Sequence, residues 1–481
     1  MHDIVLVEPA IDERQLPNLG LAAINSYLRL RGFDSVQIDL PKINDYAGKT
    51  KVFGISVWDH SYLSARQVTH SIKRHYPDST VIWGGWAAMA MPEWMLENNP
   101  AADVVVLQDG ERRVEQLLEH YRNGAPEGGL EKIDGLAYRR ADGSVIRQPV
   151  TTYFDLDQLP VPKGDDHLSV RRADGQGILY VELARGCYGS CAYCQHIIKM
   201  RFRDPIKVAS EIEFWRAQGH QEFYIGNDNS IANVKLLEAL VDELERRKVD
   251  VRVWLTGRPN DVLKGLHVVE RIFRSEYVRP ASIEMGIESN SRAMLLKLRR
   301  GLTPEINRKA MDALMRLRAE YAPEVKINAN MILFPHWEMA LEDFAANVQF
   351  IGDYESSRST MSLQLYGVPG TPLWTEMTAK GFQPEGKFGR RITDYPFDDP
   401  EVERLFDALI RWPREQMQKN PFAPNLQYFH FQYAIHDRVM EWYRSGDVLS
   451  AARAFIASEG RERPSAPPAE PAAPSAAEQA V

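Results

Sequence analysis

Three cysteines close together are the residues of this chain best suited to chemistry. Cys187, Cys191 and Cys194 lie in the segment Arg-Gly-Cys-Tyr-Gly-Ser-Cys-Ala-Tyr-Cys and are its only cysteines. An odd, isolated trio does not suit a disulfide framework. Three thiolates on one loop can ligate three irons of a four-iron cluster and leave the fourth iron open, as catalytic metal sites keep a position free. Gly186 and Gly189 permit the backbone to wrap closely around such a cluster.

Zinc is the alternative metal for this loop. A structural zinc site needs a fourth ligand and usually joins two separated pairs of ligands. His196, two residues after the last cysteine, is the candidate for that fourth position.

The elements that position these residues begin with strand–helix alternation over residues 1–125. Short apolar segments such as Asp3–Pro9 alternate with amphipathic helices, which predicts a doubly wound, Rossmann-like parallel sheet. Glycine-bearing turns follow the expected fourth and fifth strands, at Trp83-Gly84-Gly85-Trp86 and Asp109-Gly110-Glu111. Ligands of doubly wound folds bind at that edge of the sheet.

A connector over residues 126–175 is expected next, with a hairpin at Ala141-Asp142-Gly143. Alternation then resumes over residues 176–375, and six expected strands predict a partial (β/α)6 barrel with the cysteines after its first strand. Residues 376–459 are expected to be a helical region that covers the open end of the barrel. Residues 460–481 contain mainly Pro, Ala, Ser and Glu and are expected to be a disordered tail.

Composition limits the partners. The chain is 44% hydrophobic and 26% charged, and its net charge of −8 is spread without a basic stripe. Nucleic acid is therefore not an expected partner. No stretch approaches the roughly 18 apolar residues of a membrane span, and the first residues have no basic segment before an apolar one. We expect a cytoplasmic protein without a membrane partner.

The cysteine spacing, with Tyr193 before the third cysteine, resembles the radical S-adenosylmethionine (radical SAM) superfamily. Glu182–Gly186 before the loop, Arg201–Arg203 after it and the connector segment Ile133–Arg139 resemble the branch that carries an N-terminal cobalamin-binding domain. The resemblance covers about residues 1–375. It implies a 4Fe-4S cluster on Cys187, Cys191 and Cys194, with S-adenosylmethionine (SAM) and cobalamin as further cofactors.

The same resemblance implies three residues of the SAM site. Asp228, at the end of the second barrel strand, is the candidate for the SAM amino group. Glu288 is the candidate for the ribose hydroxyls, with Ser289 alongside, and a carboxylate accepts such bonds well. The alternative is that Asp228 and Glu288 only cap helices at strand ends.

On the cobalamin-binding domain, the resemblance implies that Gly84, Gly85, Gly110 and Glu111 lie at the cofactor. The Asp-x-His-x-x-Gly signature that supplies a histidine to cobalt in many cobalamin proteins is absent, and His60 lacks its spacing. We therefore expect water or an apolar or uncharged side chain below the cobalt. The alternative is a domain that has lost its cofactor and only supports the barrel.

The function that the resemblance implies is cobalamin-dependent methyl transfer to an unactivated carbon of a small metabolite, in bacterial secondary metabolism such as antibiotic biosynthesis. An external electron donor such as flavodoxin or ferredoxin would reduce the cluster. Methylthiotransferases need three further cysteines, which this chain lacks. The alternatives are a cobalamin-dependent radical oxidative cyclase or ring-rearranging enzyme, and a sensor without turnover. Candidates for the substrate pocket are His196, Tyr366 and the aromatic segment Tyr428–Tyr433, and the alternative is that the aromatic residues form helix core.

Overall fold

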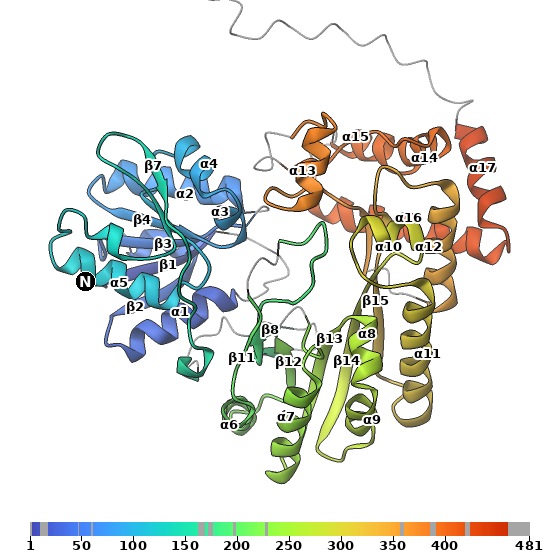
Figure 1. The fold of residues 1–481 in the computed structure, drawn as a ribbon, viewed down its shortest axis with the longest axis horizontal. Coiled ribbons are helices and arrows are strands. Elements are labelled where there is room, and N and C mark those ends of the chain that lie inside the picture. The colour runs from blue at the N-terminus through green and yellow to red at the C-terminus, as the bar shows by residue number, and fades with distance from the viewer. Residues whose placement is uncertain are drawn as a thin grey trace, which may run out of the picture.

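The structure is a computed structural model, and it describes residues 2–9, 18–46, 48–58, 61–161, 169–171, 177–195, 199–226, 229–355, 360–384, 391–418 and 424–459. Figure 1 shows an N-terminal lobe in blue and teal, a strand-and-helix lobe in green and yellow, and orange and red helices over one end of that second lobe. The expected disordered tail, residues 460–481, lies outside the described residues.

Seven strands of the described chain form the N-terminal sheet, in the order β2-β1-β3-β4-β5-β6-β7. The first five pair in parallel, and β6 and β7 are antiparallel. The strands are β1 (Ile4–Glu8), β2 (Ser35–Asp39), β3 (Val52–Ser56), β4 (Thr80–Gly84), β5 (Val104–Val106), β6 (Leu136–Arg139) and β7 (Val145–Arg147). The helices are α1 (Leu19–Leu30), α2 (Tyr62–His75), α3 (Trp86–Ala90), α4 (Pro92–Asn98) and α5 (Glu111–Arg122).

Local sequence explains these elements. Helix α1 begins after Asn18, whose side-chain oxygen accepts a hydrogen bond from the Leu21 amide at 3.0 Å, and it ends before Gly32, which has φ +84°. Apolar side chains pack on both faces of the sheet, in two separate buried clusters. The expected doubly wound sheet is thus confirmed. The expected hairpin is present as β6 and β7, which lie in the expected connector and extend this sheet.

The second sheet has the order β16-β15-β14-β13-β12-β9-β8 among the described residues. Strand β9 and strands β12 to β16 pair in parallel, and β8 is antiparallel to β9. The strands are β8 (Ser169–Arg171), β9 (Gly177–Glu182), β12 (Glu222–Gly226), β13 (Val251–Gly257), β14 (Val278–Glu288), β15 (Lys326–Phe334) and β16 (Met361–Gln364). This is the expected partial barrel of six parallel strands.

The barrel helices are α6 (Pro205–Ala217), α7 (Val234–Arg246), α8 (Pro259–Lys264), α9 (Leu266–Arg274), α10 (Arg292–Lys297), α11 (Pro304–Tyr321) and α12 (Leu341–Asp353). Helices α6 and α11 each begin with proline at the first helical position, after Asp204 and Thr303, whose side chains accept an amide hydrogen bond of the first turn. These signals fix where α6 and α11 begin. Because the six strands are parallel, their carboxyl ends lie at the same edge of the sheet.

Residues after the barrel form α13 (Pro372–Ala379), α14 (Pro400–Phe406), a π-helical turn (Asp407–Arg411), α15 (Trp412–Gln418), α16 (Pro424–Arg444) and α17 (Val448–Glu459). Phe397, Phe406 and Val439 from this region are buried in the same apolar cluster as Phe334 and Phe344 of the barrel. The C-terminal helices are thus a part of the barrel's core. No helix of the described residues is long and apolar enough to cross a membrane.

Candidate functional site

The cysteine loop, residues 186–195, lies at the carboxyl end of β9. A two-stranded ribbon joins the two ends of this region, because β10 (Ala184–Arg185) pairs antiparallel with β11 (Arg201–Phe202). The Ala192 amide donates to the Leu298 carbonyl at 2.9 Å, and the Leu373 amide donates to the Ala192 carbonyl at 2.8 Å. The loop is therefore held by the ends of α10 and α13 as well as by its own strand.

The three cysteines share this loop. Cys191 is buried, while Cys187 and Cys194 are half-buried. The Gly189 amide donates to the Cys187 Sγ at 3.3 Å. At no point in the described chain do three or more Cys, His, Asp or Glu side chains converge as a preformed metal site. The cysteines are thus brought together by their loop and not by a rigid ligand geometry.

Two arginines surround the cysteine loop with positive charge. The Arg300 Nη1 donates to the Cys191 Sγ and to the Tyr193 hydroxyl, both at 3.3 Å. Arg258 also lies against the loop, because a Cβ atom on Gly189 would come within 2.6 Å of its Nη1, and its Nη2 donates to the Arg300 carbonyl. The Nε atoms of Arg258 and Arg300 are buried without an acceptor among the described residues. This surrounding suits an anionic group such as a thiolate-ligated cluster.

Glu288 lies beside the cysteine loop at the end of β14. Its backbone has φ +67°, an uncommon conformation for a residue with a side chain, at an irregularity in the β14–β15 pairing. A Cβ atom on Gly286 would lie 2.8 Å from the Glu288 Oε1. Burial raises the pKa of Glu288, against the charge of Arg300 and a hydrogen bond with Tyr193. The structure thus brings Glu288 and the cysteine loop together.

Ser289 has partners on the opposite side of that strand end. Its hydroxyl donates to the Asn347 Oδ1 at 2.8 Å, and its carbonyl accepts from the Asn307 Nδ2 at 3.0 Å. The side chain of Ser289 is fully buried. These contacts give Ser289 a role in packing α11 and α12 against β14.

Asp228 lies outside the described residues, but the neighbouring Asn229 is described and buried. The Asn229 Nδ2 donates to the Asp261 Oδ2 at 2.6 Å, and the Tyr188 hydroxyl donates to the same oxygen at 2.6 Å. The end of β12 is therefore tied to the cysteine loop through Asp261. The Asn229 Oδ1 is buried without a hydrogen-bond donor among the described residues.

Gly84 and Gly85 at the end of β4 differ in their surroundings. A Cβ atom on Gly84 would meet nothing within 4 Å. Gly85 has φ +90°, and its Cβ would come within 2.8 Å of the Val57 carbonyl oxygen. Gly85 is therefore required by the fold itself, whereas the open space over Gly84 is available to a ligand and fits a cobalamin tail.

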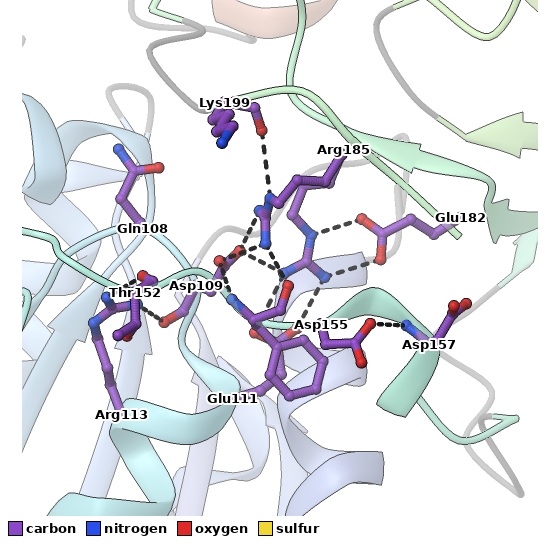
Figure 2. Close-up of polar contacts among 12 residues, drawn as sticks. Gln108, Asp109, Glu111, Arg113, Thr152, Asp155, Asp157, Glu182, Arg185 and Lys199 are labelled. Atoms are coloured by element: carbon purple, nitrogen blue, oxygen red, sulfur yellow. Dashed lines mark hydrogen bonds and ion pairs between the residues drawn. The ribbon is translucent and has the colours of Figure 1, made fainter. Parts of the chain in front are cut away.

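Gly110 and Glu111 are occupied by protein contacts. A Cβ atom on Gly110 would come within 2.4 Å of the Ile24 Cδ1, so this glycine allows α1 and α5 to approach. The Glu111 carboxylate is 2% exposed and accepts from the Arg185 Nη2 at 2.8 Å. Figure 2 shows Glu111, Asp109 and Glu182 converging on Arg185, which precedes the cysteine loop. Both residues thus contribute to packing of the N-terminal lobe and to its contact with the barrel.

A cavity of about 210 Å³ lies between the two lobes. It is bounded by α3, β7, the cysteine loop and the turn after β16, through Trp86, Met89, Ala90, Arg147, Gln195, Pro369 and Gly370. Gly370 has φ +81°, and its Cβ would come within 3.1 Å of the Ala90 Cβ. The turn therefore approaches the N-terminal lobe as closely as a glycine permits.

The remaining predicted residues are distributed as follows. His60 and His196 lie outside the described residues. Tyr366 is half-buried directly after β16. Within the aromatic segment, Phe431 is buried in the core and His430 is exposed, as expected of an amphipathic helix.

The sequence interpretation missed Arg258, Arg300 and Asp261. All three lie next to the cysteine loop in the structure, although they are far from it in the sequence. For Arg258 the sequence offered a signal, because Gly257-Arg258-Pro259-Asn260 lies at the end of a barrel strand, where catalytic residues of such barrels are found.

Comparison with known proteins finds one matching family and several relatives. Residues 13–118 match the B12 binding domain family. The anaerobic magnesium-protoporphyrin IX monomethyl ester cyclase of Synechocystis sp. is 24% identical over 328 residues, which are 64% of this chain and 64% of the cyclase. The match thus spans somewhat less than two thirds of that relative's length.

Two solved structures share the fold. OxsB, a cobalamin-dependent S-adenosylmethionine radical enzyme with aqua-cobalamin and S-adenosylmethionine bound, has a TM-score of 0.72 and 17% identity, covering 91% of this chain and 72% of OxsB. TsrM from Kitasatospora setae, a radical S-adenosylmethionine methyltransferase with cobalamin and a [4Fe-4S] cluster bound, has a TM-score of 0.64 and 19% identity, covering 79% of this chain and 78% of TsrM. The chain therefore has a match to the B12 binding domain family over residues 13–118 and shares its overall fold with these two cobalamin-binding radical SAM enzymes.

Proposed function

We propose that this protein is a cobalamin-dependent radical SAM methyltransferase that acts on an unactivated carbon of a small metabolite in bacterial secondary metabolism, such as antibiotic biosynthesis. Its cofactors are a 4Fe-4S cluster on Cys187, Cys191 and Cys194, SAM and cobalamin. When bound, they supply a 5′-deoxyadenosyl radical that removes a hydrogen atom from the substrate and a cobalt-bound methyl group that replaces it. An external flavodoxin or ferredoxin supplies the electrons.

One observation carries this proposal. The cavity between the lobes is bounded on one side by Trp86, two residues after the open Gly84, and on the other by Gln195, next to Cys194. A methyl donor at the first edge and a radical source at the second would therefore face one shared space. A position between two lobes limits the access of water, which protects a reactive intermediate.

The residues of the chain perform supporting tasks in this proposal. Arg300 and Arg258 hold positive charge beside the cysteine loop and stabilise its thiolates. Glu288 lies within the same cluster of side chains, with Tyr193 between it and the cysteines. It is the residue we assign to the SAM ribose. Asp228 is assigned to the SAM amino group, next to Asn229 with its buried, unbonded Oδ1.

A radical oxidative cyclase is the second candidate, because the Synechocystis relative is named as a cyclase. Product analysis separates the two reactions. The reconstituted and reduced enzyme is incubated with SAM and candidate metabolites. Methyl transfer gives S-adenosylhomocysteine together with 5′-deoxyadenosine and a substrate heavier by one methyl group. A cyclase gives 5′-deoxyadenosine without S-adenosylhomocysteine.

The matched control is the same protein reconstituted without cobalamin. It should keep formation of 5′-deoxyadenosine and lose that of S-adenosylhomocysteine. Absence of both products from the fully loaded enzyme, with every candidate metabolite, would favour a sensor and overturn the proposal.

A further inference from the structure

Two acidic residues of the N-terminal lobe are buried where the lobe meets the barrel. Asp109 and Glu111 follow β5, and their side chains are 1% and 2% exposed. A buried carboxylate is costly unless it is paired and hydrogen-bonded. Their partners therefore decide what they do.

Both partners are arginines at the base of the cysteine loop. The Arg185 Nη1 donates to the Asp109 Oδ1 at 2.8 Å, and the Arg201 Nη1 and Nη2 donate to the two Asp109 oxygens, each at 2.8 Å. Arg185 precedes the loop and Arg201 follows it, and the two are direct partners in the β10–β11 ribbon. A single carboxylate of the N-terminal lobe thus holds the chain on both sides of the cysteines.

The arrangement is saturated with hydrogen bonds. Glu182 accepts from the Arg185 Nε at 2.7 Å, and Glu111 accepts from its Nη2 at 2.8 Å. The Phe154 amide donates to the Asp109 Oδ2 at 2.9 Å, and the Phe154 carbonyl accepts from the Arg201 Nη1 at 2.6 Å. Figure 2 shows Asp109, Glu111 and Glu182 around Arg185. Burial alone would raise the pKa of Asp109, but the arginine contacts outweigh it and lower the pKa.

We propose that Asp109 and Glu111 are positioning residues that fix the cysteine loop against the cobalamin-binding lobe and so set the separation between the cluster and cobalamin. They act through Arg185 and Arg201. Fork-to-carboxylate pairs have a fixed geometry, which suits them to this task better than apolar packing. The inference rests on the family's cofactors, and it holds for a methyltransferase and a cyclase alike.

The test measures the separation of the cofactors without any substrate. In the holoenzyme, a reduced paramagnetic cluster speeds the spin relaxation of nearby cob(II)alamin, and the enhancement falls steeply with distance. We expect the Asp109→Asn variant, which keeps the shape and loses the charge, to bind cluster and cobalamin but to lose much of that enhancement. Asp103→Asn is the matched control, because Asp103 pairs with Lys73 at 2.7 Å within the N-terminal lobe and contacts neither arginine of the ribbon. It should keep the wild-type value.

An unchanged relaxation enhancement in Asp109→Asn would overturn the proposal and leave the network a purely stabilising role. Should Asp109→Asn lose its cofactors, Arg201→Lys decides, because lysine keeps the charge but cannot make two parallel bonds. A weakened enhancement in Arg201→Lys supports the proposal, and a wild-type value refutes it. Absence of methyl transfer would contradict the proposed function but would not affect this measurement.

Discussion

The two adjacent glycines at the end of β4, Gly84 and Gly85, give the sharpest test of where cobalamin binds. Alanine at Gly85 must adopt φ +90° and must fit a Cβ 2.8 Å from a backbone oxygen. The backbone conformation costs about 1–2 kcal/mol and the overpacking about 1–3 kcal/mol, so we expect Gly85→Ala to lose about 2–5 kcal/mol of stability. Gly84→Ala enters open space, and we expect its stability to stay the same or rise by about 0.4–1 kcal/mol.

For cobalamin affinity, we expect the substitution at Gly84 to be the damaging one. A leucine at Gly84 would fill the space that we assign to cobalamin, and a clash of about 1–3 kcal/mol corresponds to about 5- to 150-fold weaker binding. Thermal unfolding of the cofactor-free proteins measures stability, and spectroscopic titration measures cobalamin affinity. Wild-type affinity in Gly84→Leu would refute the assignment of this edge. Wild-type stability in Gly85→Ala would refute the geometry on which the comparison rests.

Four further outcomes are expected. Replacing all three cysteines by alanine should remove the iron and abolish 5′-deoxyadenosine formation, and iron analysis showing about four irons per chain in that variant would contradict the cluster assignment. Electron paramagnetic resonance of the cob(II)alamin form should show no nitrogen splitting from an axial imidazole, because the histidine signature is absent. Burial raises the pKa of Glu284, so the folded protein favours the protonated acid and loses stability as the pH rises. Glu284→Gln should therefore unfold at a higher temperature than wild type. The difference in unfolding temperature should grow above pH 4.5, which thermal melts at a series of pH values would show. Deletion after Glu459 should leave activity nearly intact, whereas deletion after Phe382 should yield no folded protein by circular dichroism.

The second deletion illustrates a limit of the sequence interpretation. The sequence predicts that residues 376–459 cover the open end of the barrel, and these helices lie over one end of that lobe (Figure 1). They also contribute to its core, because Phe406 and Val439 are buried with Phe334 and Phe344. Loss of one such phenylalanine side chain costs about 3–5 kcal/mol, and removal of the whole region exceeds the stability of about 5–15 kcal/mol that typical domains possess.

Local patterns were sufficient to predict the helices and strands. The alternation of short apolar segments with helices predicted both parallel sheets, because hydrophobic periodicity directly reflects which face of an element is buried. The spacing of Cys187, Cys191 and Cys194 is likewise a local pattern, and it predicts a cluster on this loop because the three proposed ligands are neighbours in the chain. Turn glycines such as Gly85 could also be recognised from the sequence, because the turn that requires them is local.

Only the tertiary structure showed the roles of residues whose contact partners are far away in the sequence. Asp109 and Glu111 looked like part of a cofactor edge, yet Asp109 pairs with Arg185 and Arg201, 76 and 92 positions away. Gly110 is explained by its approach to Ile24, and Arg300 reaches Cys191 across 109 positions. No periodicity encodes such pairs, because they arise only when packing of the two lobes brings charged side chains into a water-poor interface where each must find a partner.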